Sequence, residues 1–364
     1  YLYKIMNDYS KKLLNKFPKQ LDTVFFVCTG SEANDLAYRI AQNYTNSRDV
    51  LVMDNAYHGH TNTLIDLSPY KFNGKGGLGK KDYVHIADMP DGLRGKWTYS
   101  EKNWVKKYIL QVNSLVDQIY ADNRKLACFF VESILGCGGQ VVLPPNYLKE
   151  VFNIIKKHNA LCIVDEVQTG FGRVGNYFWA FEEHGILPDI VTLGKPMGNG
   201  HPIAAVVTTK KIAKNFNNGM EYFNSFGGTP VSCSIGNSVL DVIENEKLQN
   251  HAKIIGEYFI NSLNKIKLKF PKLIAEVRGR GLFLGIDLIK NQNNIPDAKL
   301  ATFVVNKMRE HGILLSTDGP YLNVIKIKPP MTFNKENVDL VCYKLINIFE
   351  NLTIKNKKNS INYH

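Results

Sequence analysis

Ile163-Val164-Asp165-Glu166-Val167-Gln168-Thr169-Gly170 joins an apolar run to two adjacent carboxylates and a glycine. Together with Leu161 and Cys162, the apolar residues predict a short strand that is buried on both faces, as in a parallel sheet. An ionised aspartate at the end of such a strand needs a nearby cation to offset its desolvation. A protonated ring nitrogen of a ligand is one such partner, and a structural ion pair is the alternative.

Further short apolar runs lie on both sides of this stretch and alternate with helical patterns. Helices are expected from about Glu32, with Leu36 and Ile40 on one face, and from Tyr147 to His158. The runs expected as strands are 24–27, 51–53, 127–131, 161–164, 190–193 and 204–207. This alternation predicts an α/β fold with a mainly parallel sheet in a large domain. Ligands of such sheets bind beyond the carboxyl ends of the strands, where the polar motifs of this chain follow.

The pattern changes from about residue 237. One long helix is expected from about Asn237 to Leu263, with later helices near 298–311 and 337–349. We therefore expect a large domain over residues 1–236, a smaller C-terminal α+β domain over 237–352, and a disordered tail over 353–364.

Composition excludes several classes of function. Hydrophobic residues make up 44% and charged residues 21%, a globular balance, and no apolar run reaches the ~18 residues that span a membrane. The six cysteines include no CxxC pair, which favours free thiols in a reducing compartment over disulfides or a metal site. The net charge is +12, but the lysines form no dense stripe with interleaved aromatics, so we expect no nucleic-acid partner. No signal-like segment is present, and we expect the cytoplasm, with the mitochondrion as the open alternative.

Two motifs follow the first two expected strands. Thr29-Gly30-Ser31-Glu32-Ala33-Asn34 joins a strand to a helix, where free N–H groups and the helix dipole favour an anion such as phosphate. The alternative is an ordinary glycine turn with a serine cap. Asp54-Asn55-Ala56-Tyr57-His58-Gly59-His60 places an aromatic ring beside a histidine, which suits stacking on a flat heterocycle. The alternative is a core aromatic with a satisfied histidine.

A lysine closes a later strand. In Leu193-Gly194-Lys195-Pro196-Met197-Gly198-Asn199-Gly200, partial desolvation of Lys195 would favour its neutral amine, which is a nucleophile and a base. The alternative is a surface lysine in a glycine-rich loop. Phosphate turn, aromatic, strand-end aspartate and strand-end lysine occur in the order expected of one pyridoxal 5'-phosphate (PLP) site.

From its first residues to about residue 350 the chain resembles the class III (omega-type) aminotransferases, which have the PLP fold type I. The resemblance rests on the blocks beginning at Thr29 and Gly194 and on Asp-Glu-Val-Gln-Thr-Gly-Phe-Gly-Arg at 165–173. It implies a homodimer with active sites at the subunit interface. It also implies that Lys195 holds the cofactor covalently and that Asp165 pairs with the ring nitrogen. The other cofactor contacts that it implies are Gly30 and Ser31 at the phosphate, Tyr57 on the ring with His58 beside it, the acid Glu132, Gln168 near the ring hydroxyl, and Ser225 at the phosphate of the partner subunit.

Within this family the chain resembles the phospho-lyases that act on ethanolamine phosphate or 5-phosphohydroxylysine, in the segments 65–72, 194–202 and 324–331. Many class III transaminases have an arginine that binds the substrate carboxylate near the position of Lys326. Its absence fits a substrate without that carboxylate, unless another residue binds it. The residues expected to contact the substrate phosphate are Lys71, Lys326 and Lys328.

The sequence favours an amine phospho-lyase with a small phosphorylated amine as substrate. The alternative is an aminotransferase that moves an amino group to a keto acid, of the alanine–glyoxylate or omega-amine type. A second alternative is a catalytically inactive fragment, because familiar members of the family begin well before this chain does.

Overall fold

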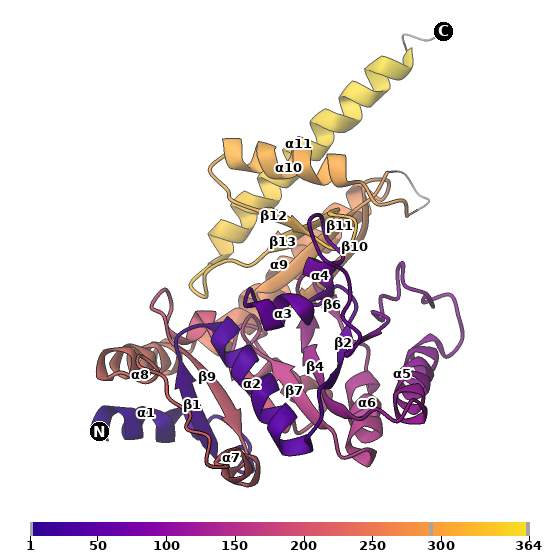
Figure 1. Ribbon diagram of the computed structural model, residues 1–364. Coiled ribbons are helices and arrows are strands. Elements are labelled where there is room, and N and C mark those ends of the chain that lie inside the picture. Colours follow the sequence, from indigo (N-terminus) through magenta and orange to yellow (C-terminus); the bar gives the residue numbers. More distant parts are fainter. Residues whose placement is uncertain (1–2, 291–293, 362–364) are drawn as a thin grey trace. The chain divides into compact units, whose positions relative to one another are not determined.

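The computed structural model describes residues 3–290 and 294–361, with side chains as far as residue 354. The chain forms two compact units (Figure 1). The first unit comprises residues 1–136, 141–172 and 177–248, and the second comprises 137–140, 173–176 and 249–364. This grouping differs from the division expected at residue 237, because α8 (Pro230–Asn245) packs on α1 (Lys4–Leu14) within the first unit.

A seven-stranded sheet forms the centre of the first unit, in the order β1-β9-β8-β7-β4-β2-β3 (Figure 1). Its strands are β1 (Thr23–Val27), β2 (Asp49–Met53), β3 (Val84–Ala87), β4 (Leu126–Glu132), β7 (Leu161–Asp165), β8 (Ile190–Leu193) and β9 (Ala204–Thr208). Only β9 runs antiparallel to both of its neighbours. The prediction of a mainly parallel sheet is confirmed.

Because β1, β2, β4, β7 and β8 run in one direction, their carboxyl ends share one edge of the sheet, here called the carboxyl edge. The register places Glu132 beside Asp165, and Asp165 beside Thr192. Polar motifs that are far apart in the sequence therefore meet at this edge. The opposite side of the sheet, where β2 and β7 begin, is the amino edge.

Helices cover both faces of this sheet. On one face lie α2 (Gly30–Thr45), α3 (Asn62–Asp66), α4 (Pro69–Phe72) and α7 (Lys210–Phe216), which share an apolar core cluster with the strands. On β4, Phe130 belongs to this cluster, whereas its neighbour Phe129 packs edge-on against Phe152 of α6 (Tyr147–Lys157). Successive strand residues point to opposite faces, so α6, together with α5 (Trp104–Ala121), covers the other face.

The second unit contains a four-stranded antiparallel sheet in the order β10-β11-β13-β12. Its strands are β10 (Ile274–Arg280), β11 (Phe283–Leu288), β12 (Ser316–Asp318) and β13 (Val324–Ile327), and its helices are α9 (Leu248–Lys269), α10 (Ala298–Glu310) and α11 (Lys335–Ile361). This is the expected smaller α+β region.

Two expectations about helices differ from the structure. The single helix expected over 237–263 is two helices, because Lys247 adopts a φ of 53° between α8 and α9. The tail expected to be disordered from residue 353 is helical as far as Ile361, and residues 362–364 lie outside the described residues. No glycine or proline interrupts the sequence after Pro330, so nothing in it breaks α11.

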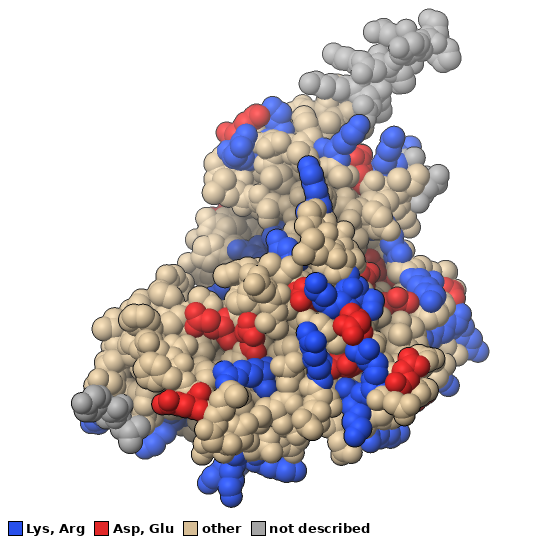
Figure 2. Space-filling model, in the orientation of Figure 1, with Lys and Arg blue, Asp and Glu red and all other residues tan. Residues whose placement is uncertain are grey.

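The structure also describes the cysteines, the charged surface and the apolar character of the helices. None of the six cysteines is paired in a disulfide. Figure 2 shows Lys and Arg side chains spread among acidic and uncharged residues on the face in view, rather than gathered in one stripe. Within residues 3–290 and 294–361, no helix has both the length and the apolar character needed to cross a membrane.

Candidate active site

The turn after β1 leads into α2, and its cap is Thr29. The Thr29 hydroxyl accepts the N–H of Glu32 at 3.1 Å, and the Glu32 carboxylate in turn accepts the N–H of Cys28 at 2.8 Å. The serine cap considered from the sequence is therefore wrong, since the Ser31 hydroxyl instead accepts the N–H of His60. Within the described part of the chain, the N–H groups of Gly30 and Ser31 have no hydrogen-bond partner. They are available to an anion at the amino end of a 16-residue helix.

Two glycines bring this turn against the loop of the strand-end lysine. A Cβ on Gly30 would lie 2.9 Å from a methyl group of Val167, and one on Gly194 would lie 3.1 Å from the Cα of Gly30. The first distance is shorter than real Cβ contacts, and the second is tighter than most of them, so a side chain at either position would displace its neighbour. The turn at residues 29–34, Val167 and the residue before Lys195 thus meet at one point of the carboxyl edge.

The segment after β2 packs against the same turn. A Cβ on Gly59 would lie 2.7 Å from the Ser31 hydroxyl, and Gly59 has a φ of 149°. Ser68 accepts the N–H of His58 at 2.9 Å, which joins the segment to α3 and α4. Tyr57 and Tyr70 meet edge to face with their ring centres 6.0 Å apart, and stacking of Tyr57 on a cofactor ring stays a prediction.

Asp165 ends β7 with its side chain only 6% exposed. Its Oδ2 accepts a hydrogen bond from Nδ2 of Asn34 at 2.8 Å and lies 3.0 Å from Nδ1 of His58, while its Oδ1 accepts the N–H of Val167 at 3.0 Å. No lysine or arginine among the described residues forms an ion pair with it. An ion pair with lysine or arginine is therefore absent among the described residues, and the partners of the carboxylate are the Asn34 amide, the Val167 N–H and the His58 ring.

Glu166, the next residue, has a structural role. Its buried carboxylate accepts hydrogen bonds from the hydroxyls of Ser133 and Thr169 and from the N–H groups of Ala180 and Phe181. Burial raises the pKa of Glu166 to about 7, although these four hydrogen bonds favour the ionised form. Its hydrogen bonds bind the end of β7 to the start of η1 (Ala180–His184).

Glu132 and Gln168 lie close to each other at the same edge. Glu132 is 3% exposed and accepts the N–H of Gly136 at 3.2 Å. A Cβ on Gly136 would lie 3.0 Å from the Gln168 amide and 3.1 Å from the Glu132 carboxylate. Both side chains therefore border Gly136, and the strand register places Glu132 beside Asp165.

Lys195 follows β8 with a φ of 31°, a strained backbone conformation for a residue that carries a Cβ. Such strain costs about 1–3 kcal/mol and concentrates at functional sites. The Lys195 side chain is exposed and takes part in no hydrogen bond or ion pair among the described residues. Its ammonium is available to a ligand at the carboxyl edge. Ser225 is also exposed, in the loop before α8.

The three lysines expected at a substrate phosphate differ in their surroundings. Lys71, in the first unit, places its ammonium 5.5 Å from the ring centre of Tyr57 and 5.3 Å from that of Tyr70. In the second unit, Lys326 pairs with Asp318 at 2.8 Å and Lys328 lies 4.1 Å from the ring centre of Phe283. Lys71 is thus the one that the structure places beside a predicted cofactor contact.

Sequence reasoning missed Asn34 and Val167. Asn34 lies on the same face of α2 as buried Tyr38 and Ala41, so a polar residue interrupts an apolar stripe. That interruption was a signal in the sequence. Val167 carried no such signal, because an apolar residue after a buried strand predicts only a residue of the hydrophobic core.

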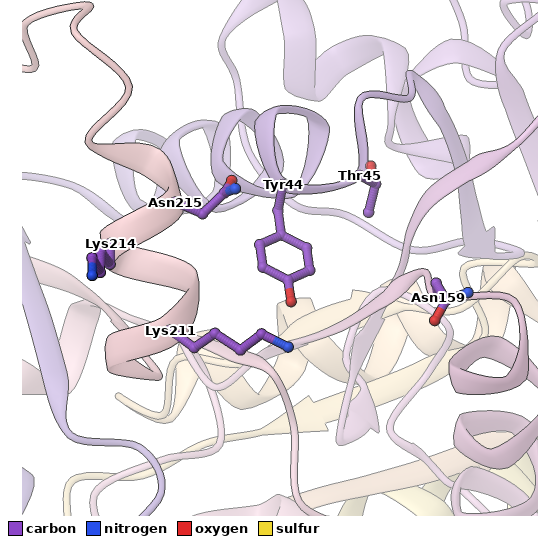
Figure 3. A pocket seen from close by; sticks show the side chains of 6 residues that line it. All are labelled: Tyr44, Thr45, Asn159, Lys211, Lys214 and Asn215. Atoms are coloured by element: carbon purple, nitrogen blue, oxygen red, sulfur yellow. The ribbon is translucent and has the colours of Figure 1, made fainter.

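A cavity of about 710 Å³ lies at the amino edge of the first unit and not at the carboxyl edge (Figure 3). It is lined by Tyr44, Thr45, Asn159, Lys211, Lys214 and Asn215. Figure 3 shows the Tyr44 side chain directed towards Lys211, and none of the lining side chains is fully buried. The residues with catalytic chemistry lie at the other end of the strands.

Comparison with known proteins identifies the family of the chain. Residues 1–349 match the family Aminotransferase class-III. A Drosophila melanogaster protein named alanine–glyoxylate aminotransferase 2-like is 47% identical over 336 residues, which cover 91% of this chain and 68% of that protein. Ethanolamine-phosphate phospho-lyase homolog 1 of Caenorhabditis elegans is 42% identical over 92% of this chain and 74% of its own length. A phospholyase from Arthrobacter, solved in complex with phosphoethanolamine, superposes with a TM-score of 0.90 at 34% identity, covering 95% of this chain and 81% of that one.

The carboxyl edge suits PLP, the cofactor of this family. Among the described residues, it offers N–H groups without a partner to a phosphate, a carboxylate with no lysine or arginine partner to a protonated ring nitrogen, and an unpaired lysine amine to an aldehyde. The chain belongs to the class III aminotransferase family and is a PLP-dependent enzyme with the fold of that family.

Proposed function

We propose that the chain is an amine phospho-lyase that eliminates phosphate from ethanolamine phosphate or a related phosphorylated amine such as 5-phosphohydroxylysine. The observation that carries the proposal is Lys71, an exposed residue whose ammonium lies near the rings of Tyr57 and Tyr70. The similarity to an Arthrobacter phospholyase solved with phosphoethanolamine and to a nematode phospho-lyase homolog supports it.

In this proposal each residue has one task. When bound, PLP supplies an electron sink for negative charge on the amino-bearing carbon of the substrate. Gly30 and Ser31 would hold its phosphate through their N–H groups, and Asp165 would pair with its ring nitrogen. Tyr57 would stack on the ring with His58 beside it, Gln168 would lie near the ring hydroxyl, and Glu132 would be an active-site acid.

Lys195 is the proposed base. Its Nζ would take the proton from the amino-bearing carbon, and the C–O bond of the adjacent carbon would break with its electron pair leaving on phosphate. Water then completes the reaction. The overall balance for ethanolamine phosphate is substrate plus water giving acetaldehyde, ammonia and inorganic phosphate.

The first test measures products without an amino acceptor. The purified chain is incubated with PLP and ethanolamine phosphate in the absence of any keto acid, and phosphate, aldehyde and ammonia are assayed. The proposal expects all three in equal amounts, and expects Lys195→Ala to abolish them. Turnover only after addition of pyruvate or glyoxylate would establish the aminotransferase alternative instead.

Lys71 provides the test of substrate class. We expect Lys71→Ala to raise the KM for ethanolamine phosphate about 10–100-fold, the range of a lost hydrogen bond to a charged group, with PLP binding unchanged. Lys106→Ala removes an exposed lysine of α5 in the same unit and is the matched control. An equal KM in the two variants would contradict the role of Lys71, and Lys326→Ala and Lys328→Ala then test the remaining lysines.

We also propose that the enzyme is a homodimer in which Ser225 reaches the cofactor phosphate of the partner subunit. The support is local: Ser225 is flanked by the exposed side chains of Phe223 and Phe226, which are 76% and 72% exposed. Mixed dimers test it, because Lys195→Ala and Ser225→Ala subunits together contain one site with both residues intact. Activity of the mixture above that of either variant supports a shared site, and no gain contradicts it.

The expected compartment is the cytoplasm. Relatives from Homo sapiens and Arabidopsis thaliana carry mitochondrial names, at 36% and 39% identity, so the mitochondrion is the alternative. Fractionation of cells that express the full-length protein decides between them.

A further inference from the structure

The contacts of Asn34 carry an inference beyond the proposed roles at the carboxyl edge. Asn34 is 2% exposed, and its Nδ2 donates hydrogen bonds to Asp165 Oδ2 at 2.8 Å and to the carbonyl oxygen of His58 at 2.6 Å. Both partners are acceptors, so the nitrogen and not the oxygen of the amide must face them. The orientation of the Asn34 side chain is therefore determined by its contacts.

This arrangement has a cost. Oδ1 of Asn34 is buried and has no hydrogen-bond partner within residues 3–290 and 294–361. A buried acceptor without a partner is unfavourable, and an apolar residue would fit the stripe of Tyr38 and Ala41 on α2 without that cost. What asparagine adds at this position is its two donated hydrogen bonds.

His58 completes the surroundings of Asp165. Its Nδ1 lies 3.0 Å from Asp165 Oδ2, and its ring stacks on Phe130 at 4.2 Å. The side chain is 0% exposed, and Nε2 has no hydrogen-bond partner among the described residues. An imidazolium would leave an N–H unsatisfied at Nε2, whereas a neutral ring with its proton on Nδ1 leaves only a lone pair there. The neutral ring is the form that these contacts favour.

We propose that Asn34 is a positioning residue that, together with a neutral His58, holds Asp165 charged and oriented so that its negative charge is left for the ring nitrogen of PLP. Three neutral donors, from Asn34, His58 and the Val167 N–H, stabilise the carboxylate without cancelling its charge. The inference rests on the proposed pairing of Asp165 with that nitrogen.

The first experiment measures the dissociation constant of PLP from the full chain by its absorbance. We expect Asn34→Ala to weaken PLP binding about 10-fold or more, as expected for a lost hydrogen bond to a charged group. The control is Asn323→Ala in the second unit. Asn323 is 1% exposed and likewise donates to a carboxylate and a carbonyl, those of Asp287 and Leu288, so its loss matches the structural cost. Equal PLP affinity in both variants would overturn the inference.

A second variant separates positioning from packing. Asn34→Asp keeps the shape but sets a carboxylate against Asp165, so it should bind PLP more weakly than Asn34→Ala at pH 8. When protonated, the new carboxyl again donates to Asp165, so its affinity relative to the unmodified chain should recover as the pH falls. The other titratable groups near this position are His58 and Glu132, which both proteins share. A pH-independent ratio would contradict the inference.

Two variants of His58 test whether its imidazole ring is neutral. His58→Asn keeps an N–H donor near the position of Nδ1 and is neutral at every pH, whereas His58→Leu removes the donor. We expect His58→Asn to bind PLP within about threefold of the unmodified chain and His58→Leu about 10-fold more weakly. Equal losses in the two variants would contradict a neutral His58.

Asp165→Asn distinguishes a failure of the proposed pairing between Asp165 and PLP from a failure of the positioning role of Asn34. If it leaves PLP affinity unchanged, the proposed pairing of Asp165 itself fails. If it weakens binding while Asn34→Ala does not, only the positioning role of Asn34 fails.

Discussion

Two aspartate–histidine pairs lie at opposite edges of the same sheet. At the carboxyl edge His58 Nδ1 lies 3.0 Å from Asp165, and at the amino edge His85 Nε2 lies 2.7 Å from Asp49. Both aspartates are nearly buried, with side chains 6% and 8% exposed. The pairs differ in what else they meet: Arg124 binds Asp49 with two nitrogens, at 2.6 and 3.0 Å, whereas Asp165 meets only neutral donors.

The difference shows that the same two residue types can serve stability at one edge of the sheet and be available to a ligand at the other. A charge that is already paired contributes to stability and has little left for a ligand. A carboxylate that is hydrogen-bonded but not neutralised attracts a cation that arrives later, which is the condition for a cofactor with a protonated ring. The amino edge is thus stabilised internally, and the carboxyl edge is completed by its ligand.

The largest expected effect comes from exchanging the two aspartates for asparagine. Asp165→Asn removes the charge at the carboxyl edge, and kcat/KM should fall about 10²–10³-fold, the range for one preorganised electrostatic group. Asp49→Asn should instead lower stability and leave kcat/KM within about twofold. Steady-state assays and urea unfolding of both variants check this, and a large loss of turnover in Asp49→Asn would break the comparison.

Removing the cation of the amino edge should have a smaller effect. Arg124→Gln leaves Asp49 with His85 alone, and the free energy of unfolding should fall by roughly 1–2 kcal/mol, less than for a buried pair because the Arg124 side chain is 35% exposed. PLP affinity should not change. Urea denaturation gives the first quantity and absorbance titration the second, and weaker PLP binding would show that the edges are coupled.

Glu166 predicts a pH dependence of stability. Burial raises its pKa from the ordinary 4.5 to about 7, so between these values the folded chain binds more protons than the unfolded chain. The stability contributed by this group is present below about pH 4.5 and is lost as the pH rises through 7, by roughly 3 kcal/mol at most. Unfolding measured from pH 5 to 8 tests the sign.

Two variants test whether Glu166 causes the pH dependence of the free energy of unfolding. Glu166→Gln cannot ionise and should flatten this part of the profile, although its amide would face the donors of Ala180 or Phe181 and lower stability overall. Glu336→Gln removes an exposed carboxylate of α11 and should keep the slope. A profile that Glu166→Gln leaves unchanged would contradict the assignment.

The smallest effect is expected at the cavity of the amino edge. Lys211→Ala and Lys214→Ala change exposed side chains there, so stability should stay within about 0.5 kcal/mol and turnover within about twofold. Thermal unfolding and the phosphate assay check both. A loss of turnover would mean that this cavity takes part in the reaction.

The sequence by itself determined which polar segments follow the strands of the sheet. Apolar runs that end in Asp165 or lead to Lys195 predict parallel strands, and parallel strands bring their carboxyl ends to one edge. Hydrophobic alternation depends on neighbouring residues, so it can be read without a structure. The family was identified from the same blocks, through their resemblance to the class III aminotransferases.

Only the tertiary structure decided which residues form hydrogen bonds with the charged groups at that edge. The hydrogen bonds of Asp165 reach back to Asn34 and His58 across other strands. The sequence marks both positions as unusual, but nothing in it identifies Asp165 as their partner. The break between α8 and α9 at Lys247 was likewise missed, because its left-handed backbone follows from packing and not from a glycine or proline. Local sequence determines periodicity, whereas the pairing of a buried charge depends on contacts between distant segments, which form only when the sheet has assembled.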